Sequence, residues 1–158
     1  MERTEYVKID PAAEDLGREA VRTAIAKDRG GFEKALEEIA RAAPALRDQV
    51  LPIYSAVGRS VLRSIYSGGA PNQKQNLEMA QQIRATSPWA PLELKEIWET
   101  LEGLSSANHT PDVAPERLAA TLFVVVGYLL AAYTKSSGFE SFYDYLDAVL
   151  NDLVRPSS

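Results

Sequence analysis

The chain has 158 residues, of which 46% are hydrophobic and 25% are charged, and its formal net charge is -5. These values are ordinary for a single globular domain over residues 1–158, long enough to bury a core without disulfides or structural metals. The absence of cysteine excludes disulfides, thiolate chemistry and cysteine metal sites, and the acidic balance disfavours nucleic-acid binding. Residues 1–10 lack the apolar segment of a secretory signal, so a cytoplasmic location is expected.

Two helices are predicted at the start of the chain. Asp10 followed by Pro11 is typical of a helix start, because aspartate caps the first turn and proline lacks a donor that this turn leaves unpaired. That first helix is expected to end before Gly30 and Gly31, which should separate it from the next. The second helix is predicted over residues 32–43 from apolar side chains spaced three and four apart.

A longer apolar stripe follows Pro44 and continues to Tyr66, which predicts a third helix. Pro52 lies inside it and is expected to kink the helix or split it in two, because proline removes a donor and clashes with the preceding turn. Gly58 is expected to permit the close approach of another helix. A more polar helix is predicted over residues 72–85.

The second half of the chain contains its most apolar segment. A helix over residues 92–104 and a loop over 105–114 are predicted to precede a central helix over residues 115–134. Residues 118–134 carry no charge, and a helix that is apolar on all sides is buried in lipid or at the centre of a protein. Their helical length of about 26 Å falls short of the ~30 Å hydrocarbon core of a membrane. A buried central helix is therefore preferred to a membrane span.

The last predicted helix completes an all-α, single-domain bundle of six or seven helices around the central one. Ser137 and Glu140 have the spacing of a capping box, so the helix is expected to begin there. Tyr145 lies off the main apolar face of this helix and is expected to be exposed. Residues 1–9 and 155–158 are expected to be frayed.

Acidic residues on two helices suggest one enzymatic alternative. Glu96 and Glu99 are candidates to share a divalent cation with Asp144 and Asp147, as carboxylate pairs do in helical metal-dependent nucleotide hydrolases. The same acids fit a solvated helix face, and neither a phosphate-binding glycine loop nor a serine nucleophile turn accompanies them. His109, the only histidine, is expected to lie exposed in its loop. No catalytic residue and no cofactor is therefore predicted.

Aromatic and small residues suggest binding surfaces instead. Trp89 and Tyr145 are candidate surface anchors, since aromatic side chains with a polar group suit interfaces as well as cores. Small residues of the central helix are the places where a neighbouring helix or a ligand could approach most closely: Gly127 and the alanines at 119, 120, 131 and 132. A pocket for a small apolar ligand beside Phe123 and Tyr128 is one hypothesis.

The function expected first is a non-catalytic regulatory or adaptor protein that binds another protein and forms a homodimer. This expectation follows from the missing catalytic constellation and from the amount of apolar helix surface that a small chain must cover. The metal-dependent nucleotide hydrolase and the apolar-ligand binder remain alternatives. Neither a nucleic-acid nor a membrane partner is expected.

Overall fold

The computed structural model describes residues 10–106 and 108–154, and within that part of the chain it contains seven α-helices and no strand. The predicted all-α bundle is therefore confirmed. The predictions of frayed ends at residues 1–9 and 155–158 fall outside the described residues. The helices are α1 (Pro11–Ile25), α2 (Arg29–Arg41), α3 (Pro44–Ile65), α4 (Gln73–Thr86), α5 (Leu94–Ser105), α6 (Pro115–Tyr133) and α7 (Phe142–Val154).

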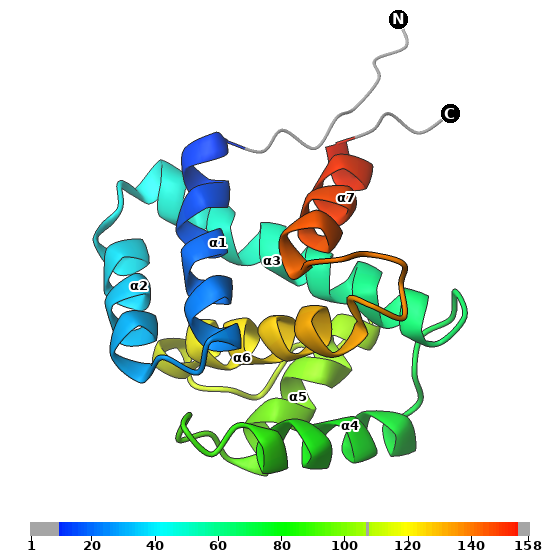
Figure 1. Cartoon of the computed structure of the whole chain (residues 1–158). Coiled ribbons are helices and arrows are strands. Elements are labelled where there is room, and N and C mark those ends of the chain that lie inside the picture. The colour runs from blue at the N-terminus through cyan, green and yellow to red at the C-terminus, as the bar shows by residue number, and fades with distance from the viewer. Residues whose placement is uncertain (1–9, 107, 155–158) are drawn as a thin grey trace, which may run out of the picture.

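The helix α6 crosses the middle of the bundle, as Figure 1 shows. It packs most extensively against α1 and α3, and also against α5 and α7, while α4 is held mainly by α5. Phe123, Val125 and Val126 on α6 are completely buried and belong to one hydrophobic core. Within the described residues α6 alone is long and apolar enough to cross a membrane. Half of the residues in its apolar stretch of 18 residues are buried inside the protein.

An aspartate caps the start of each of the first two helices, and in α2 this cap is followed by two glycines. Asp10 caps α1 as predicted, because its side chain accepts a hydrogen bond from the Ala12 N–H at 2.9 Å. Asp28 caps α2 in the same way, at 3.0 Å from the backbone nitrogen of Gly31. The prediction that Gly30 and Gly31 separate the two helices is therefore wrong. Both glycines lie in the first turn of α2, where the aspartate cap compensates for their low helix propensity.

The long helix α3 is continuous, so Pro52 does not split it. The predicted close approach at Gly58 is confirmed. A Cβ atom at Gly58 would lie 2.9 Å from Leu104 Cδ1 and 3.3 Å from Val126 Cγ2, so α3 meets α5 and α6 at a point where any side chain would clash.

A second close contact joins α1 to α3. The Tyr54 side chain is completely buried, and its hydroxyl donates a hydrogen bond to the Glu14 carbonyl oxygen at 2.7 Å. A Cβ atom on Gly17 would lie only 1.9 Å from Tyr54 Cε2. The absence of a side chain at Gly17 therefore makes room for the tyrosine ring against α1.

The last helix begins later than predicted. Ser137 and Glu140 do not form the start of α7, because Ser137 N–H donates to the Tyr133 carbonyl at 3.0 Å and so belongs to the turn that ends α6. The helix starts at Phe142, where Ser141 Oγ accepts a hydrogen bond from the Asp144 N–H at 3.3 Å. The capping side chain thus comes directly before the helix.

The prediction that Tyr145 is exposed is also wrong. Tyr145 is 4% exposed, and its ring stacks on that of Phe139 with centroids 5.0 Å apart. Phe139 lies in the connection before α7, so a face of the helix that looks free in the sequence is covered by the chain that leads into it. The buried Tyr145 hydroxyl has no hydrogen-bond partner within the described residues.

Candidate functional site

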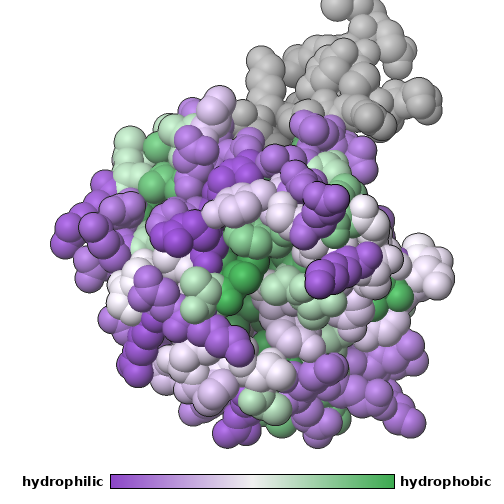
Figure 2. All heavy atoms as spheres, viewed as in Figure 1, coloured by the Kyte–Doolittle hydropathy of each residue, from purple (hydrophilic) through white to green (hydrophobic). Residues whose placement is uncertain are grey.

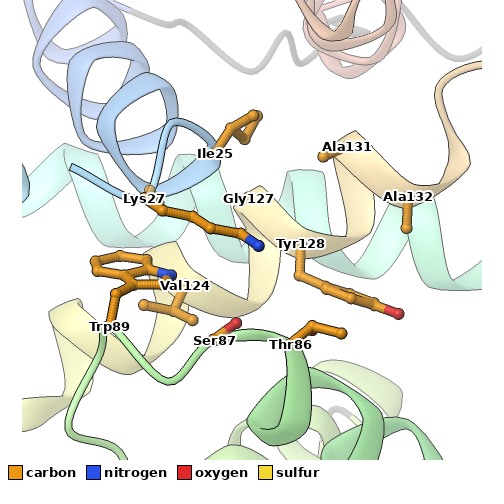
Figure 3. A pocket seen from close by; sticks show the side chains of 11 residues that line it. Ile25, Lys27, Thr86, Ser87, Trp89, Val124, Gly127, Tyr128, Ala131 and Ala132 are labelled. Atoms are coloured by element: carbon orange, nitrogen blue, oxygen red, sulfur yellow. The ribbon is translucent and has the colours of Figure 1, made fainter. Parts of the chain in front are cut away.

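A hollow of about 250 Å³ lies against the middle of α6. We call it the Lys27 pocket (Figure 3). In the space-filling view an apolar hollow opens near the middle of the face shown in Figure 1, and polar side chains surround it (Figure 2). Its lining comes from the end of α1, the connection between α4 and α5, and α6: Ala24, Ile25, Lys27, Thr86, Ser87, Trp89, Val124, Gly127, Tyr128, Ala131 and Ala132.

The floor of the pocket is one face of α6. Val124, Gly127 and Ala131 are spaced three and four residues apart, so they lie above one another along the helix. A Cβ atom at Gly127 would lie 3.1 Å from Ala24 Cβ, which shows how closely the end of α1 approaches α6 here. Tyr128 continues the same surface half-buried, and burial raises the pKa of its hydroxyl. The floor is therefore apolar, with a phenol at one side.

The connection between α4 and α5 supplies one wall. Trp89 stands between Pro88 and Pro91, and its ring packs edge-to-face on Phe32 with centroids 5.3 Å apart. This contact fixes the indole, and Figure 3 shows its nitrogen turned toward the hollow. Ser87 is only 8% exposed, its hydroxyl faces the hollow, and that hydroxyl has no hydrogen-bond partner among the described residues.

Lys27 reaches into the hollow from an unusual backbone conformation. Its φ of 57° lies in the left-handed region, and the Asp28 N–H donates to the Thr23 carbonyl at 3.0 Å while the Lys27 N–H donates to the Ala24 carbonyl at 3.1 Å. These two bonds form a Schellman motif, in which glycine is the usual left-handed residue. The side chain extends between Trp89 and Tyr128 (Figure 3).

Two polar groups around the pocket, the lysine ammonium and the indole N–H, can only donate hydrogen bonds. The hydroxyls of Thr86, Ser87 and Tyr128 can donate or accept, and no carboxylate lines the hollow. Lys27 has no acidic partner and no hydrogen bond from its ammonium within residues 10–106 and 108–154. The pocket therefore combines an apolar floor with a few polar groups at its edges, a composition typical of sites for small ligands.

Three of the five residues predicted for interaction or ligand binding meet at this pocket: Trp89, Gly127 and Tyr128. Phe123 does not, because it is completely buried in the core with its ring 5.3 Å from that of Tyr54. Tyr145 does not either, because its side chain on α7 is buried in the core and stacks on Phe139. Sequence reasoning missed Lys27, although a lysine directly before a capping aspartate, where one helix ends and the next begins, marks the position.

Three of the four acids proposed as metal ligands contact other partners. Glu96 Oε1 accepts a hydrogen bond from Arg117 Nη2 at 2.8 Å, and this guanidinium lowers the pKa of the Glu96 carboxyl below its ordinary value. Asp147 contacts Arg18, with 2.8 Å between Oδ1 and Nη2. Among the described residues, no group of three or more histidine or acidic side chains is arranged to hold a metal ion. The four acids, Asp144 included, therefore form no common site.

Glu99 holds the loop that precedes α6. Its Oε1 accepts a hydrogen bond from the Asp112 N–H at 2.8 Å, and this bond lowers the pKa of the Glu99 carboxyl. The same oxygen lies 2.9 Å from His109 Nε2, so the histidine is half-buried and paired where an exposed side chain was predicted. This part of α5 has a structural role in positioning the start of α6.

A second, larger hollow of about 750 Å³ lies between α2, α3 and the start of α6, and we call it the α2–α3 groove. Its surface includes Leu51 and the predicted close-approach alanines Ala119 and Ala120. Its charged residues are Glu37, Asp48 and Glu116 on the acidic side and Arg47 on the basic side.

Comparisons with protein-family models, with curated proteins and with solved structures find no match to this chain.

Proposed function

We propose that this chain is a non-catalytic binding protein that holds a small, mainly apolar organic molecule in the Lys27 pocket. One observation carries the proposal. Trp89, Gly127 and Tyr128, each singled out from the sequence for a separate reason, line a single hollow against the central helix. Pockets between helices with an apolar lining and a few polar groups are typical sites for such ligands.

The volume of the pocket limits the size of the ligand. An apolar cavity of about 150 Å³ accommodates benzene, so a hollow of about 250 Å³ accommodates roughly ten non-hydrogen atoms. Because the hollow is open to solvent, a polar end of the ligand can remain hydrated. Simple eight-carbon molecules and single indole rings match this size.

Titration with 1-octanol and with indole tests the proposal. Binding should shift the side-chain N–H signal of Trp89 in ¹H–¹⁵N spectra, because that group faces the hollow. Ala131→Leu fills the pocket and should weaken binding by about fivefold or more, the effect of losing roughly 1 kcal/mol of apolar contact. Ala45→Leu, at an exposed alanine of α3 outside both hollows, is the matched control. Absence of saturable shifts with both probes contradicts the proposal.

A second candidate function is the adaptor role expected from the sequence, with the α2–α3 groove as the contact surface. Three acids and one arginine border an apolar floor, which favours a basic amphipathic helix of another protein as the occupant. Large exposed hydrophobic side chains are few among the described residues, namely Leu77 and Tyr143. This favours a local groove contact over a broad apolar interface.

A basic amphipathic peptide should bind this groove, and Ala120→Arg should abolish its binding by adding bulk and like charge. Fluorescence anisotropy of the labelled peptide measures both, and Ala131→Leu is the control that leaves the groove unchanged. Sedimentation equilibrium checks the predicted homodimer, and a monomer at high concentration contradicts it. The regulatory role and the cytoplasmic location remain predictions.

A further inference from the structure

We infer that the Lys27 pocket selects an amphipathic carboxylate, whose negative head group contacts Lys27 while its apolar body lies along α6. This inference rests on the proposed function and adds the chemical class of the ligand. The selecting groups are the ammonium of Lys27, the indole N–H of Trp89 and the hydroxyl of Ser87, which face one hollow from two separate segments (Figure 3).

The left-handed backbone conformation of Lys27 points to a role for its side chain. A left-handed conformation costs a residue with a side chain roughly 1–2 kcal/mol relative to its preferred conformations, and glycine largely avoids this cost. The Schellman motif at the end of α1 needs only the conformation, which glycine would supply more cheaply. A strained residue whose side chain enters a pocket points to a function for that side chain.

The polar groups supply the second argument. Ser87 is more than nine-tenths buried, yet its hydroxyl is unpartnered among the described residues and faces the hollow. Because this hydroxyl opens onto the hollow, it is available to donate a hydrogen bond to an acceptor on a ligand bound there. The ammonium and the indole N–H also need acceptors, and an ionised carboxylate provides acceptors only. One lysine balances one negative charge, which favours a carboxylate over a phosphate.

The helix ends near the pocket act in the opposite direction. Both α1 and α4 end there, and the carbonyl end of a helix carries roughly half a negative charge. Capping bonds already occupy several of these carbonyls, including those of Thr23, Ala24 and Arg84. The ammonium carries a full charge and can reach hydrogen-bond contact with the ligand, so we expect it to decide the preference.

The floor of α6 then sets the orientation of the ligand. With its carboxylate between Lys27 and Ser87, the apolar body lies over Val124, Gly127 and Ala131, where small side chains leave the most space. Octanoate has eight carbons, including that of the carboxylate, and two oxygens. These ten non-hydrogen atoms match the number that the volume admits.

Three ligands with the same chain and different head groups test the inference: octanoate, 1-octanol and octylammonium. Calorimetry should show octanoate binding at least about fivefold more tightly than 1-octanol, the effect of one partly exposed charge-assisted hydrogen bond, and octylammonium more weakly than either. Octyl phosphate distinguishes the two kinds of anion and should bind no more tightly than octanoate. Tighter binding of octyl phosphate overturns the choice of a carboxylate.

Lys27→Gly separates binding from folding. In this variant octanoate and 1-octanol should bind with equal affinity, while the midpoint of thermal unfolding rises because the strain is removed. Ser67→Gly is the matched control, since Ser67 also has a left-handed φ, of 58°, and lies outside the pocket. It should raise the unfolding midpoint and leave all affinities unchanged. Lys27→Met keeps most of the apolar stem and should lose the preference as well.

The outcomes distinguish the two proposals. Equal affinities for octanoate and 1-octanol in the wild-type protein overturn the carboxylate inference and leave the proposed apolar binding intact. Retention of the octanoate preference in Lys27→Gly also overturns the inference, because the ammonium is then not the selecting group. Failure of every probe to bind overturns both proposals.

Discussion

Gly17→Ala provides a direct test of the contact between α1 and α3. Alanine is the better helix former, so at an open position this substitution would stabilise the protein by roughly 0.5–1 kcal/mol. At Gly17 the new methyl group would lie 1.9 Å from Tyr54 Cε2, about half of the usual separation between carbon atoms. The tyrosine ring or the helix must therefore move.

The magnitude follows from what the displaced ring loses. Overpacking of a buried contact costs about 1–3 kcal/mol, and the hydrogen bond from the Tyr54 hydroxyl to the Glu14 carbonyl contributes about 1 kcal/mol. After subtraction of the gain in helix propensity, Gly17→Ala should lower the free energy of unfolding by about 1–3 kcal/mol. Urea denaturation measures this change, and for a chain of this size the midpoint of thermal unfolding should fall by several degrees.

A control and a double variant make the interpretation specific. Gly30→Ala, in the first turn of α2, adds a Cβ whose nearest atom is Asp28 Oδ1 at 3.9 Å, and it should be neutral or stabilising. Gly17→Ala combined with Tyr54→Ala should be no less stable than Tyr54→Ala alone, because the ring that the methyl group displaces is gone. If Gly17→Ala stabilises the wild-type protein, the new methyl group does not displace the Tyr54 ring, and the close contact between α1 and α3 at Gly17 is contradicted.

Two further predictions concern buried polar groups. Tyr145→Phe removes a buried hydroxyl that has no partner among the described residues, and it should raise the free energy of unfolding by about 1 kcal/mol. Tyr54→Phe removes a hydroxyl that donates to the Glu14 carbonyl, and it should lower the free energy of unfolding by a similar amount. A destabilised Tyr145→Phe protein would show that the Tyr145 hydroxyl has a partner. Glu96→Gln weakens the pair with Arg117 and should cost about 1 kcal/mol at about pH 7. Because folding lowers the pKa of Glu96 below 4.5, its contribution is present above that pH and is lost as the pH falls toward the folded pKa. The difference between wild-type and Glu96→Gln in urea unfolding should therefore shrink by about pH 3, and a difference that persists unchanged contradicts the assignment.

The periodicity of the sequence was sufficient to predict the bundle and its central helix. An uncharged helix flanked by amphipathic ones is most stable in water when the amphipathic helices cover it, which places α6 inside the bundle. Gly58 was predicted for the same kind of reason, because a small residue within a bulky apolar stripe marks a helix crossing. These features depend on the local order of residues, which is visible without coordinates.

The errors arose where distant or irregular segments decide the environment of a residue. Tyr145 is buried because the connection containing Phe139 folds over it. The spacing of apolar residues along a helix does not predict the path of the connection before it. His109 is paired because Glu99 is brought to the loop by the packing of α5. Lys27 was overlooked because its importance depends on its backbone conformation and on the arrival of Trp89 from another part of the chain. Only the three-dimensional arrangement brings these residues together.

The packing of α1 against α6 has a consequence for the order in which the protein folds. These helices lie near opposite ends of the sequence, yet their contact is among the most extensive in the bundle. The chain must close a long loop before this part of the core forms, which raises its contact order above that of a bundle of successive hairpins and should slow folding. During synthesis the apolar face of α1 cannot pack against α6 until residues 115–133 have left the ribosome. Until then that face remains uncovered and open to misassociation or to chaperones.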